Sequence, residues 1–215
     1  MSEGSEGIAL KLNDLLTKAG LESLDPAVAL HFQDYLSLLI RWNARVNLTA
    51  IRDQDGILSR HFVESIGCAR ALPAGIATLL DFGSGAGFPG IPIALCRPEI
   101  SVTLAESQGK KAAFLQEAVR VLGISATVHS GRAETLSSQF DCVTLRAVDQ
   151  MQQALKTGAM LVSTGGWLAA MTTRAEMLNI QTSAGQTFQW ELVTPLPGSD
   201  ERVLALGRQG IRLPV

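Results

Sequence analysis

The chain has 215 residues, of which 47% are hydrophobic and 18% are charged, and its formal net charge is −2. A chain of this length and hydrophobicity can build a sizeable core in one domain, or in one domain with an extension, so global disorder is excluded. The nearly balanced charge excludes a surface coated with positive charge, although a local basic patch remains compatible with a nucleic-acid partner.

The cysteines and the amino terminus bear on the compartment. Cys68, Cys96 and Cys142 lie far apart and form no CxxC pair, which is typical of reduced thiols in the cytosol. The first residues, MSEGSEGIAL, carry acids where a signal peptide carries lysines. The uncharged stretch 157–173 contains glycines and hydroxyl side chains, which favours a buried helix-to-strand passage over a membrane span. We therefore expect a cytoplasmic protein with no membrane association.

Residues 1–75 are expected to form a helical extension. Asp25 and Pro26 have the character of an N-cap and first-turn pair. Behind them, apolar side chains recur at helical spacing on one face, namely Val28, Phe32, Tyr35, Leu36 and Leu39. A second amphipathic helix is predicted from about residue 59, with Phe62, Ile66 and Ala69 on its inner face.

In residues 76–215 short apolar runs alternate with helical segments. Strands are predicted at 76–80, 102–105, 126–129, 142–145 and 167–171, and helices at 91–96, 110–122 and 151–161. This alternation predicts a parallel sheet covered on both faces and joined by right-handed crossovers. Segments 187–194 and 202–206 have no helix between them, which predicts an antiparallel hairpin at one edge. We expect an α/β domain with a mostly parallel seven-stranded sheet, the Rossmann-like layout of class I S-adenosylmethionine-dependent methyltransferases.

The segment DFGSGAGFPG, residues 81–90, links the first predicted strand to its helix. Glycines there permit backbone angles that other residues avoid, in the crevice where open parallel sheets bind ligands. Gly85, Gly87 and Gly90 satisfy the GxGxxG pattern of dinucleotide sites. Asp81 with Gly83, Gly85 and Gly87 satisfies the acidic-x-Gly-x-Gly-x-Gly pattern of methyltransferases. We favour the second pattern, because an acid at 81 can hold the amino group of a methionine moiety but would repel a pyrophosphate.

Glu106 ends the next predicted strand. A carboxylate at that place can accept both hydroxyls of a ribose, a contact that S-adenosylmethionine and NAD share. Glu106 therefore indicates an adenosine ribose without discriminating between the two cofactors. An ordinary strand-end carboxylate beside a structural glycine turn stays open as an alternative.

Six blocks carry a more specific signal over roughly residues 35–170. They are RWNARVNLTAI, RHFVESI, DFGSGAGFPGIPIAL, VTLAESQGKKAAFLQ, SGRAE and FDCVTLRAV. In this order and spacing they resemble the bacterial family that methylates N7 of a guanine in 16S ribosomal RNA, also called glucose-inhibited division protein B. The resemblance implies S-adenosylmethionine as the cofactor and 16S ribosomal RNA or the small ribosomal subunit as the partner.

The resemblance also implies a cofactor site. Its expected members are Gly83, Gly85 and Phe88 on the methionine side, Glu106 at the ribose, Ala133 and Glu134 beside the adenine, and Arg146 closing the site. Two departures from the family pattern stand out. Glu106 occupies a position where Asp is more common, and the stretch AAMTTR at 169–174 lacks the usual Lys-Gly. The second departure puts one substrate contact in doubt, for which Arg174 is a possible substitute.

The expected reaction needs no general base. Guanine N7 is an exposed lone pair, and its methylation releases no ring proton, so alignment of N7 with the sulfonium methyl suffices. Enzymes acting on exocyclic amines carry an Asn/Asp-Pro-Pro-aromatic motif where this chain reads TLRA at 144–147. Cys142 lies inside a predicted strand, which favours a core residue over the nucleophile of pyrimidine C5 methylation. No catalytic acid, base or nucleophile is therefore assigned.

Basic residues flank the predicted cleft. Arg146, at a strand's carboxyl end, is expected to contact guanine O6 or the cofactor carboxylate. The further RNA-contact candidates are Arg41, Arg45, Arg52, Arg60, Lys110 and Lys111. Each alone is equally well a solvated charge, but their clustering favours a phosphate-binding face. The target guanine is expected to be unpaired, because the deep A-form groove hides N7.

No metal site is expected, since His31, His61 and His129 lack the spacing of metal ligands. His61 and Glu64 are expected to form a hydrogen-bonded pair on one helix face. A monomer is expected. Three other functions stay open: a class I methyltransferase acting on another RNA, a protein or a small molecule, an RNA-binding module without turnover, and a dinucleotide oxidoreductase.

Overall fold

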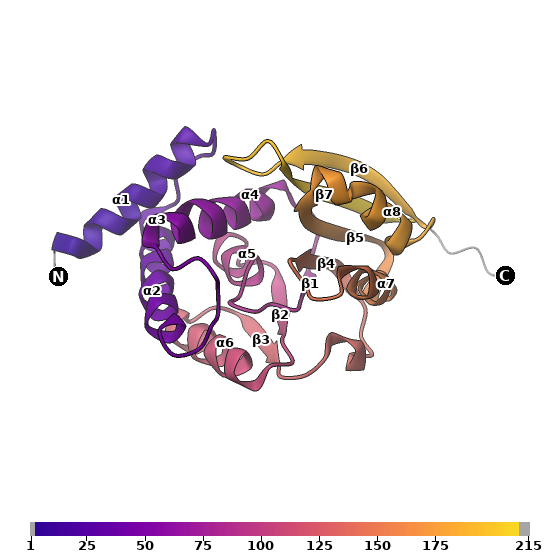
Figure 1. The fold of residues 1–215 in the computed structure, drawn as a ribbon, viewed down its shortest axis with the longest axis horizontal. Coiled ribbons are helices and arrows are strands. Elements are labelled where there is room, and N and C mark those ends of the chain that lie inside the picture. Colours follow the sequence, from indigo (N-terminus) through magenta and orange to yellow (C-terminus); the bar gives the residue numbers. More distant parts are fainter. Residues whose placement is uncertain (1–2, 211–215) are drawn as a thin grey trace.

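A computed structural model describes residues 3–210 (Figure 1). The chain begins with helices of the extension: α1 (Glu3–Lys18), α2 (Pro26–Asn43), the short α3 (Gln54–Gly56), a π-helical segment η1 (Ile57–Val63) and α4 (Glu64–Ala71). Asp25 caps α2 as predicted, because its side chain accepts a 2.9 Å hydrogen bond from the Ala27 N–H. The predicted helical extension is confirmed.

Within residues 3–210, seven strands form one sheet in the order β3-β2-β1-β4-β5-β7-β6. They are β1 (Thr78–Phe82), β2 (Ser101–Ala105), β3 (Ala126–His129), β4 (Phe140–Arg146), β5 (Val162–Thr173), β6 (Phe188–Pro195) and β7 (Arg202–Gln209). Strands β1 to β5 pair in parallel, and β7 pairs antiparallel with both β5 and β6. The predicted α/β fold of class I methyltransferases, with its edge hairpin, is confirmed.

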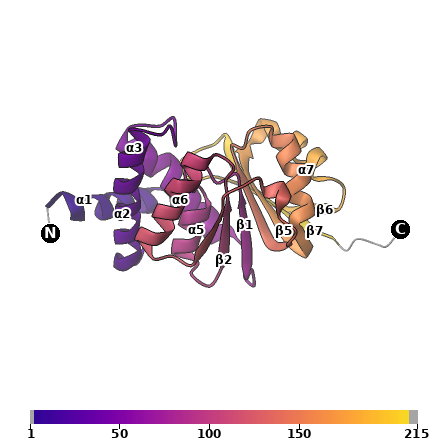
Figure 2. The same cartoon turned by 90° about the horizontal axis from the view of Figure 1, so that it is seen from below.

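Helices cover both faces of this sheet (Figure 2). The remaining helical elements are α5 (Gly90–Cys96), α6 (Gly109–Leu122), the 3₁₀ turn η2 (Ala133–Thr135), α7 (Met151–Leu161), the 3₁₀ turn η3 (Arg174–Glu176) and α8 (Met177–Ala184). Because strand side chains alternate between faces, Leu79 packs in the core with the extension, α5 and α6, whereas Leu80 packs in the core under α7 and α8. Gly123 ends α6 in the left-handed conformation, at φ 60°, as its position predicted.

The extension and the sheet share one continuous core. Tyr35 of α2 stacks on Phe62 of η1 with ring centroids 5.2 Å apart, and on Phe114 of α6 at 6.5 Å. All three rings are fully buried. The extension is therefore packed as part of the same body as the sheet, and a domain boundary near residue 75 stays a prediction.

Three elements differ from the predictions for identifiable reasons. The first and fourth strands continue through Asp81 and Arg146, where the apolar runs stop, because the folded chain buries or pairs these charged groups. Helix α8 was not predicted. Its sequence, MLNIQTSA, is short and rich in weak helix formers, and it buries only Ile180 and Ala184.

Candidate functional site

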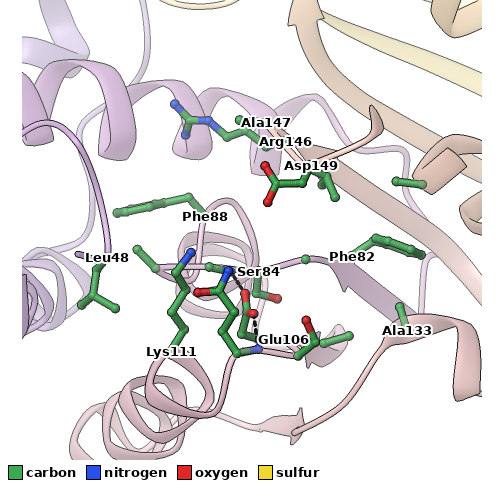
Figure 3. A pocket seen from close by; sticks show the side chains of 18 of the residues that line it. Leu48, Phe82, Ser84, Phe88, Glu106, Lys111, Ala133, Arg146, Ala147 and Asp149 are labelled. Atoms are coloured by element: carbon green, nitrogen blue, oxygen red, sulfur yellow. Dashed lines mark hydrogen bonds between the residues drawn. The ribbon is translucent and has the colours of Figure 1, made fainter. Parts of the chain in front are cut away.

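A cavity of about 730 Å³ opens at the carboxyl ends of β1, β2 and β4 (Figure 3). Phe82, Ala105 and Arg146, the last residues of these three strands, line it. Open parallel sheets bind ligands at this edge, and the volume is within the range of about 300–1,000 Å³ of small-molecule sites. The cavity is therefore the candidate functional site.

The glycine turn forms one wall of the cavity. Gly83 and Gly85 line it with φ angles of 69° and 57°, in the region that L side chains rarely adopt. A Cβ built at Gly85 would meet only the Gly83 carbonyl, at 3.9 Å, so the space above this residue is open. The turn thus offers a bare backbone surface to a ligand, as the sequence predicted.

Asp81 does not line the cavity, and its side chain is only 1% exposed. Its carboxylate accepts hydrogen bonds from the Thr144 hydroxyl at 2.8 Å and the Gly90 N–H at 3.2 Å. Burial raises the pKa of Asp81 to about 6, against the lowering effect of these bonds, of Ser84 and of the Arg146 charge. The expectation that Asp81 holds a methionine amino group is therefore wrong: it fixes the turn to β4 and to the start of α5.

Glu106 lines the cavity immediately after β2 and is 6% exposed. Its two carboxylate oxygens accept bonds from different backbone groups, Oε2 from the Gly85 N–H at 2.9 Å and Oε1 from the Gln108 N–H at 2.7 Å. These bonds fix the orientation of the carboxylate beside the glycine turn (Figure 3). Since each carboxylate oxygen has two acceptor sites, both oxygens can still accept from a ligand diol.

Ala133 and Glu134 come from the 3₁₀ turn η2 and line the cavity on the side of β3. Ala133 is buried, whereas the Glu134 carboxylate lies 3.9 Å from the Arg132 guanidinium and is 39% exposed. The structure thus brings both residues to the same cavity as Glu106. Their contact with an adenine stays a prediction.

Phe88 is held in the cavity wall by side chains of the extension. The His61 imidazole stacks on its ring with centroids 4.7 Å apart and planes 21° apart. Nearby, the Tyr35 hydroxyl donates a 2.5 Å hydrogen bond to the Ala86 carbonyl of the glycine turn. The extension therefore positions the turn from behind.

His61 does not pair with Glu64, contrary to expectation. Its Nε2 lies 2.7 Å from the Thr49 hydroxyl. Burial, followed by the charges of Arg146 and Arg60, lowers the pKa of His61 to about 3, so the imidazole is neutral at pH 7. His61 thus contributes a neutral aromatic surface to the wall.

Arg146 lines the cavity but is anchored to the extension. Its guanidinium donates to the Glu64 carboxylate at 2.8 Å, the Arg60 carbonyl at 2.7 Å and the Ser65 hydroxyl at 3.1 Å. Its Cζ lies 5.9 Å from the centroid of the Phe88 ring. The guanidinium has five N–H groups, so these three bonds leave donors for a ligand. Its expected contact with guanine or with the cofactor stays a prediction.

Glu64 joins Arg146 to the carboxyl-terminal hairpin. Its Oε1 accepts a 2.7 Å bond from Nε of Arg202, the first residue of β7. Glu64 is 1% exposed, and the two arginine side chains are 13% and 29% exposed. Sequence reasoning missed this buried triad, because its members are separated by long stretches of chain.

The structure divides the RNA-contact candidates into two groups. Arg60 and Lys111 line the cavity. The others do not: Arg41 forms an ion pair with Glu117 at 2.9 Å, Arg52 donates to Asn47 at 2.9 Å, and Arg45 and Lys110 are exposed outside the cavity. Arg174 also lies outside it and donates to the Asp200 carbonyl at 3.0 Å, so the proposed substitution for the missing Lys-Gly gains no support.

The loop after β4 supplies further cavity residues that sequence reasoning missed. Ala147, Val148, Asp149 and Gln150 all line the cavity. The available signal was their place directly after a strand that ends in the ligand crevice. None of the three cysteines lines the cavity, and Cys142 is fully buried, as predicted.

Among residues 3–210 no group of three or more His, Cys, Asp or Glu side chains is placed to hold a metal ion. In the same range no helix has both the length and the apolar character needed to cross a membrane.

Comparison with known proteins gives a consistent family. The family model described as rRNA small subunit methyltransferase G matches residues 29–193. A Ribosomal RNA small subunit methyltransferase G of Roseiflexus sp. (strain RS-1) is 39% identical over 198 residues, covering 85% of this chain and 84% of that protein. Its namesake from Xanthomonas euvesicatoria pv. vesicatoria is 44% identical over 153 residues, covering 70% and 71%.

A solved structure supports the fold at much lower sequence similarity. TYW2 of M. jannaschii, in complex with AdoMet, aligns with a TM-score of 0.56 and 12% identity, over 71% of this chain and 78% of that chain.

Proposed function

Because the chain belongs to the rRNA small subunit methyltransferase G family, we propose that it transfers the methyl group of S-adenosylmethionine to N7 of a guanine in 16S ribosomal RNA. One observation carries this proposal. In a chain that matches the family model over residues 29–193, the glycine turn and Glu106 meet in a cavity of about 730 Å³ at the carboxyl edge of the sheet. The choice of guanine N7 rests on the family resemblance of the six sequence blocks.

The residues around the cavity fit the cofactor. The lining offers a bare glycine backbone at Gly83 and Gly85. It also offers the Glu106 carboxylate, whose oxygens keep acceptor sites for the ribose hydroxyls. In this proposal Phe88 borders the methionine part, while Ala133 and Glu134 flank the adenine. S-adenosylmethionine supplies a methyl group activated by its positively charged sulfur.

In this proposal Arg146 contacts the ligand only through those of its N–H groups that are not bonded to the extension. Its bonds to Glu64, Ser65 and the Arg60 carbonyl hold the guanidinium beside the ring of Phe88. The donors that remain are suited to a carboxylate of the cofactor or to guanine O6, both of which accept hydrogen bonds.

The protein's contribution to the reaction is to position the base and to exclude water. N7 carries no hydrogen, so its lone pair can attack the methyl group without a general base, provided that it lies in line with the departing sulfur. In this proposal the Phe82 and Phe88 rings provide apolar surface in the wall beside the reacting groups.

On the substrate side, we propose that Arg60 and Lys111 contact RNA phosphates at the cavity mouth, with Arg41, Arg45 and Lys110 farther out. Arg60 on η1 and Lys111 on α6 line the cavity, and Lys110 precedes Lys111 on the same helix. Arg41 lies on α2 and Arg45 just after it, outside the cavity. Because phosphate contacts release counterions, binding of the subunit should weaken steeply as salt is raised.

We also propose that the protein acts in the cytoplasm as a monomer. The first point rests on the three sparse cysteines, none of which forms a disulfide, and the monomeric state stays a prediction.

The test uses purified protein, S-adenosylmethionine labelled in its methyl group, and small ribosomal subunits from cells that lack the modification. Nucleoside digestion should recover the label as 7-methylguanosine. Label in another nucleoside would replace guanine N7 with a different acceptor atom. Cofactor binding without any label in the RNA would overturn the ribosomal substrate, and the same assay with cell protein or small-molecule fractions would then identify the acceptor class.

A further inference from the structure

The loop between β4 and α7 is held in an unusual backbone conformation. Ala147 and Gln150 have φ angles of 49° and 53°, in the left-handed region that residues other than glycine seldom occupy. Such conformations are strained and persist where the surrounding structure imposes them, commonly at ligand sites.

Two contacts hold the loop at the cavity. The Val148 side chain packs against the glycine turn, so that a Cβ at Gly83 would lie 3.2 Å from it. The Gln150 carbonyl accepts hydrogen bonds from Gln153 and Ala154 in the first turn of α7. Asp149 lies between these two fixed points.

Asp149 presents a free carboxylate to the cavity. It lines the cavity and is exposed, and within residues 3–210 its side chain has no hydrogen bond or ion pair. Figure 3 shows its carboxylate directed into the cavity, while the neighbouring Arg146 guanidinium turns away from it. The other carboxylates of the wall are engaged, Glu106 with two backbone N–H groups and Glu134 beside Arg132.

A guanine whose N7 faces the methyl donor turns its Watson–Crick edge in another direction. That edge carries two adjacent donors, N1–H and the N2 amino group, and the two oxygens of a carboxylate match them. Adenine offers an acceptor at N1 and has no amino group at C2, so it cannot form this pair. Methylation at N7 also makes the purine cationic, so a carboxylate at its edge interacts more strongly as the reaction proceeds.

We propose that Asp149 is the specificity-determining residue that accepts hydrogen bonds from N1–H and N2–H of the target guanine and stabilises the positive charge developing on it. This inference rests on the proposed function, because it presupposes a guanine in the cavity.

The test compares Asp149→Asn and Asp149→Ala with the wild type and with Asp200→Asn, a matched change at an exposed carboxylate outside the cavity. Circular dichroism checks the fold of each variant. Affinity for S-adenosylmethionine is measured by calorimetry. The ratio kcat/KM is measured on unmethylated small subunits, and on subunits reconstituted with inosine, which lacks the N2 amino group, in place of the mapped guanosine.

We expect the affinity of both Asp149 variants for S-adenosylmethionine to stay within about twofold of the wild type. Their kcat/KM on subunits should fall about 10- to 100-fold, because each loses charge-assisted hydrogen bonds to the guanine. Asp200→Asn should match the wild type. The wild type should prefer guanosine to inosine by about tenfold, and Asp149→Ala should lose that preference.

Three results would overturn the inference. A parallel loss of cofactor affinity would assign Asp149 to the methionine ammonium instead. A guanosine preference that persists in Asp149→Ala would assign recognition of N2 to another residue. If the wild type itself forms no 7-methylguanosine, the proposed function fails and the role of Asp149 fails with it, an outcome that is distinguishable because it precedes any comparison of variants.

Discussion

Replacing Glu64 with glutamine tests the buried ion triad that joins α4, β4 and β7. Glu64 is 1% exposed and contacts Arg146 at 2.8 Å and Arg202 at 2.7 Å. Glutamine keeps the size of the side chain but leaves the two guanidinium groups near each other without a counter-charge. Breaking a buried ion pair at one partner reduces stability by about 3–5 kcal/mol. Because Arg202 is 29% exposed and retains some water, we expect about 3 kcal/mol.

Urea unfolding followed by circular dichroism at pH 7 measures this loss, and a parallel thermal scan should show Tm lowered by about 6–12 °C. The matched control is Glu99→Gln, which removes an ion pair with Arg97 whose carboxylate side chain is 57% exposed. An exposed pair contributes about 0–1 kcal/mol, so this variant should unfold almost as the wild type does. If Glu64→Gln cost no more than the control, the triad would not be the buried electrostatic contact described above.

Three further variants test other parts of the site. Glu106→Ala should weaken binding of S-adenosylmethionine about 30-fold or more in calorimetry, because it removes the carboxylate proposed to accept both ribose hydroxyls; unchanged affinity would place the ribose elsewhere. Folding raises the pKa of Asp81 from 3.8 to about 6, so the native state retains a proton that the unfolded state loses, and stability should fall as pH rises from about 4 to about 6. Measured by urea unfolding, the free energy of unfolding of the wild type should fall by about 2 kcal/mol more over this pH range than that of Asp81→Asn, which cannot titrate at this position. The same pH dependence in both proteins would contradict this. Gly90→Ala should destabilise by about 3 kcal/mol in the same assay, because its methyl would press on Leu104 and lie 2.7 Å from Asp81 Oδ2. Gly109→Ala, with no atom within 4 Å of the added methyl, should be nearly neutral.

Local patterns were sufficient to predict most of the sheet and its helices. Strand β3 and helix α7 occupy the predicted ranges 126–129 and 151–161, because both are bounded by loops. Strand ends were less predictable where a charged residue remained inside the strand. Arg146 is such a case, since its charge is neutralised by Glu64, 82 residues away along the chain.

Partners that are distant in sequence also explain why the role expected for Asp81 was wrong. The acidic-glycine spacing predicts a cofactor-binding turn, and the turn is present, but spacing does not reveal where a side chain points. The direction is set by Thr144 on the neighbouring strand and by the Gly90 N–H, which together take both carboxylate oxygens into the core. A donor 63 residues away, brought near by strand pairing, is not visible in the motif itself.

The extension illustrates how tertiary contacts turn a helical segment into part of a binding site. Tyr35 fixes the Ala86 carbonyl of the glycine turn, His61 supports the Phe88 ring, and Glu64 anchors Arg146. Each contact reaches a different section of the cavity wall, and all three contacting side chains belong to residues before β1. The extension also contributes Arg60 at the cavity mouth. Arg41 and Arg60, which are proposed to contact RNA, lie on α2 and η1, the elements that also carry Tyr35 and His61. A change that loosens the extension should therefore weaken cofactor binding and RNA binding together. A change at Asp149, in the loop between β4 and α7, should affect recognition of the guanine alone.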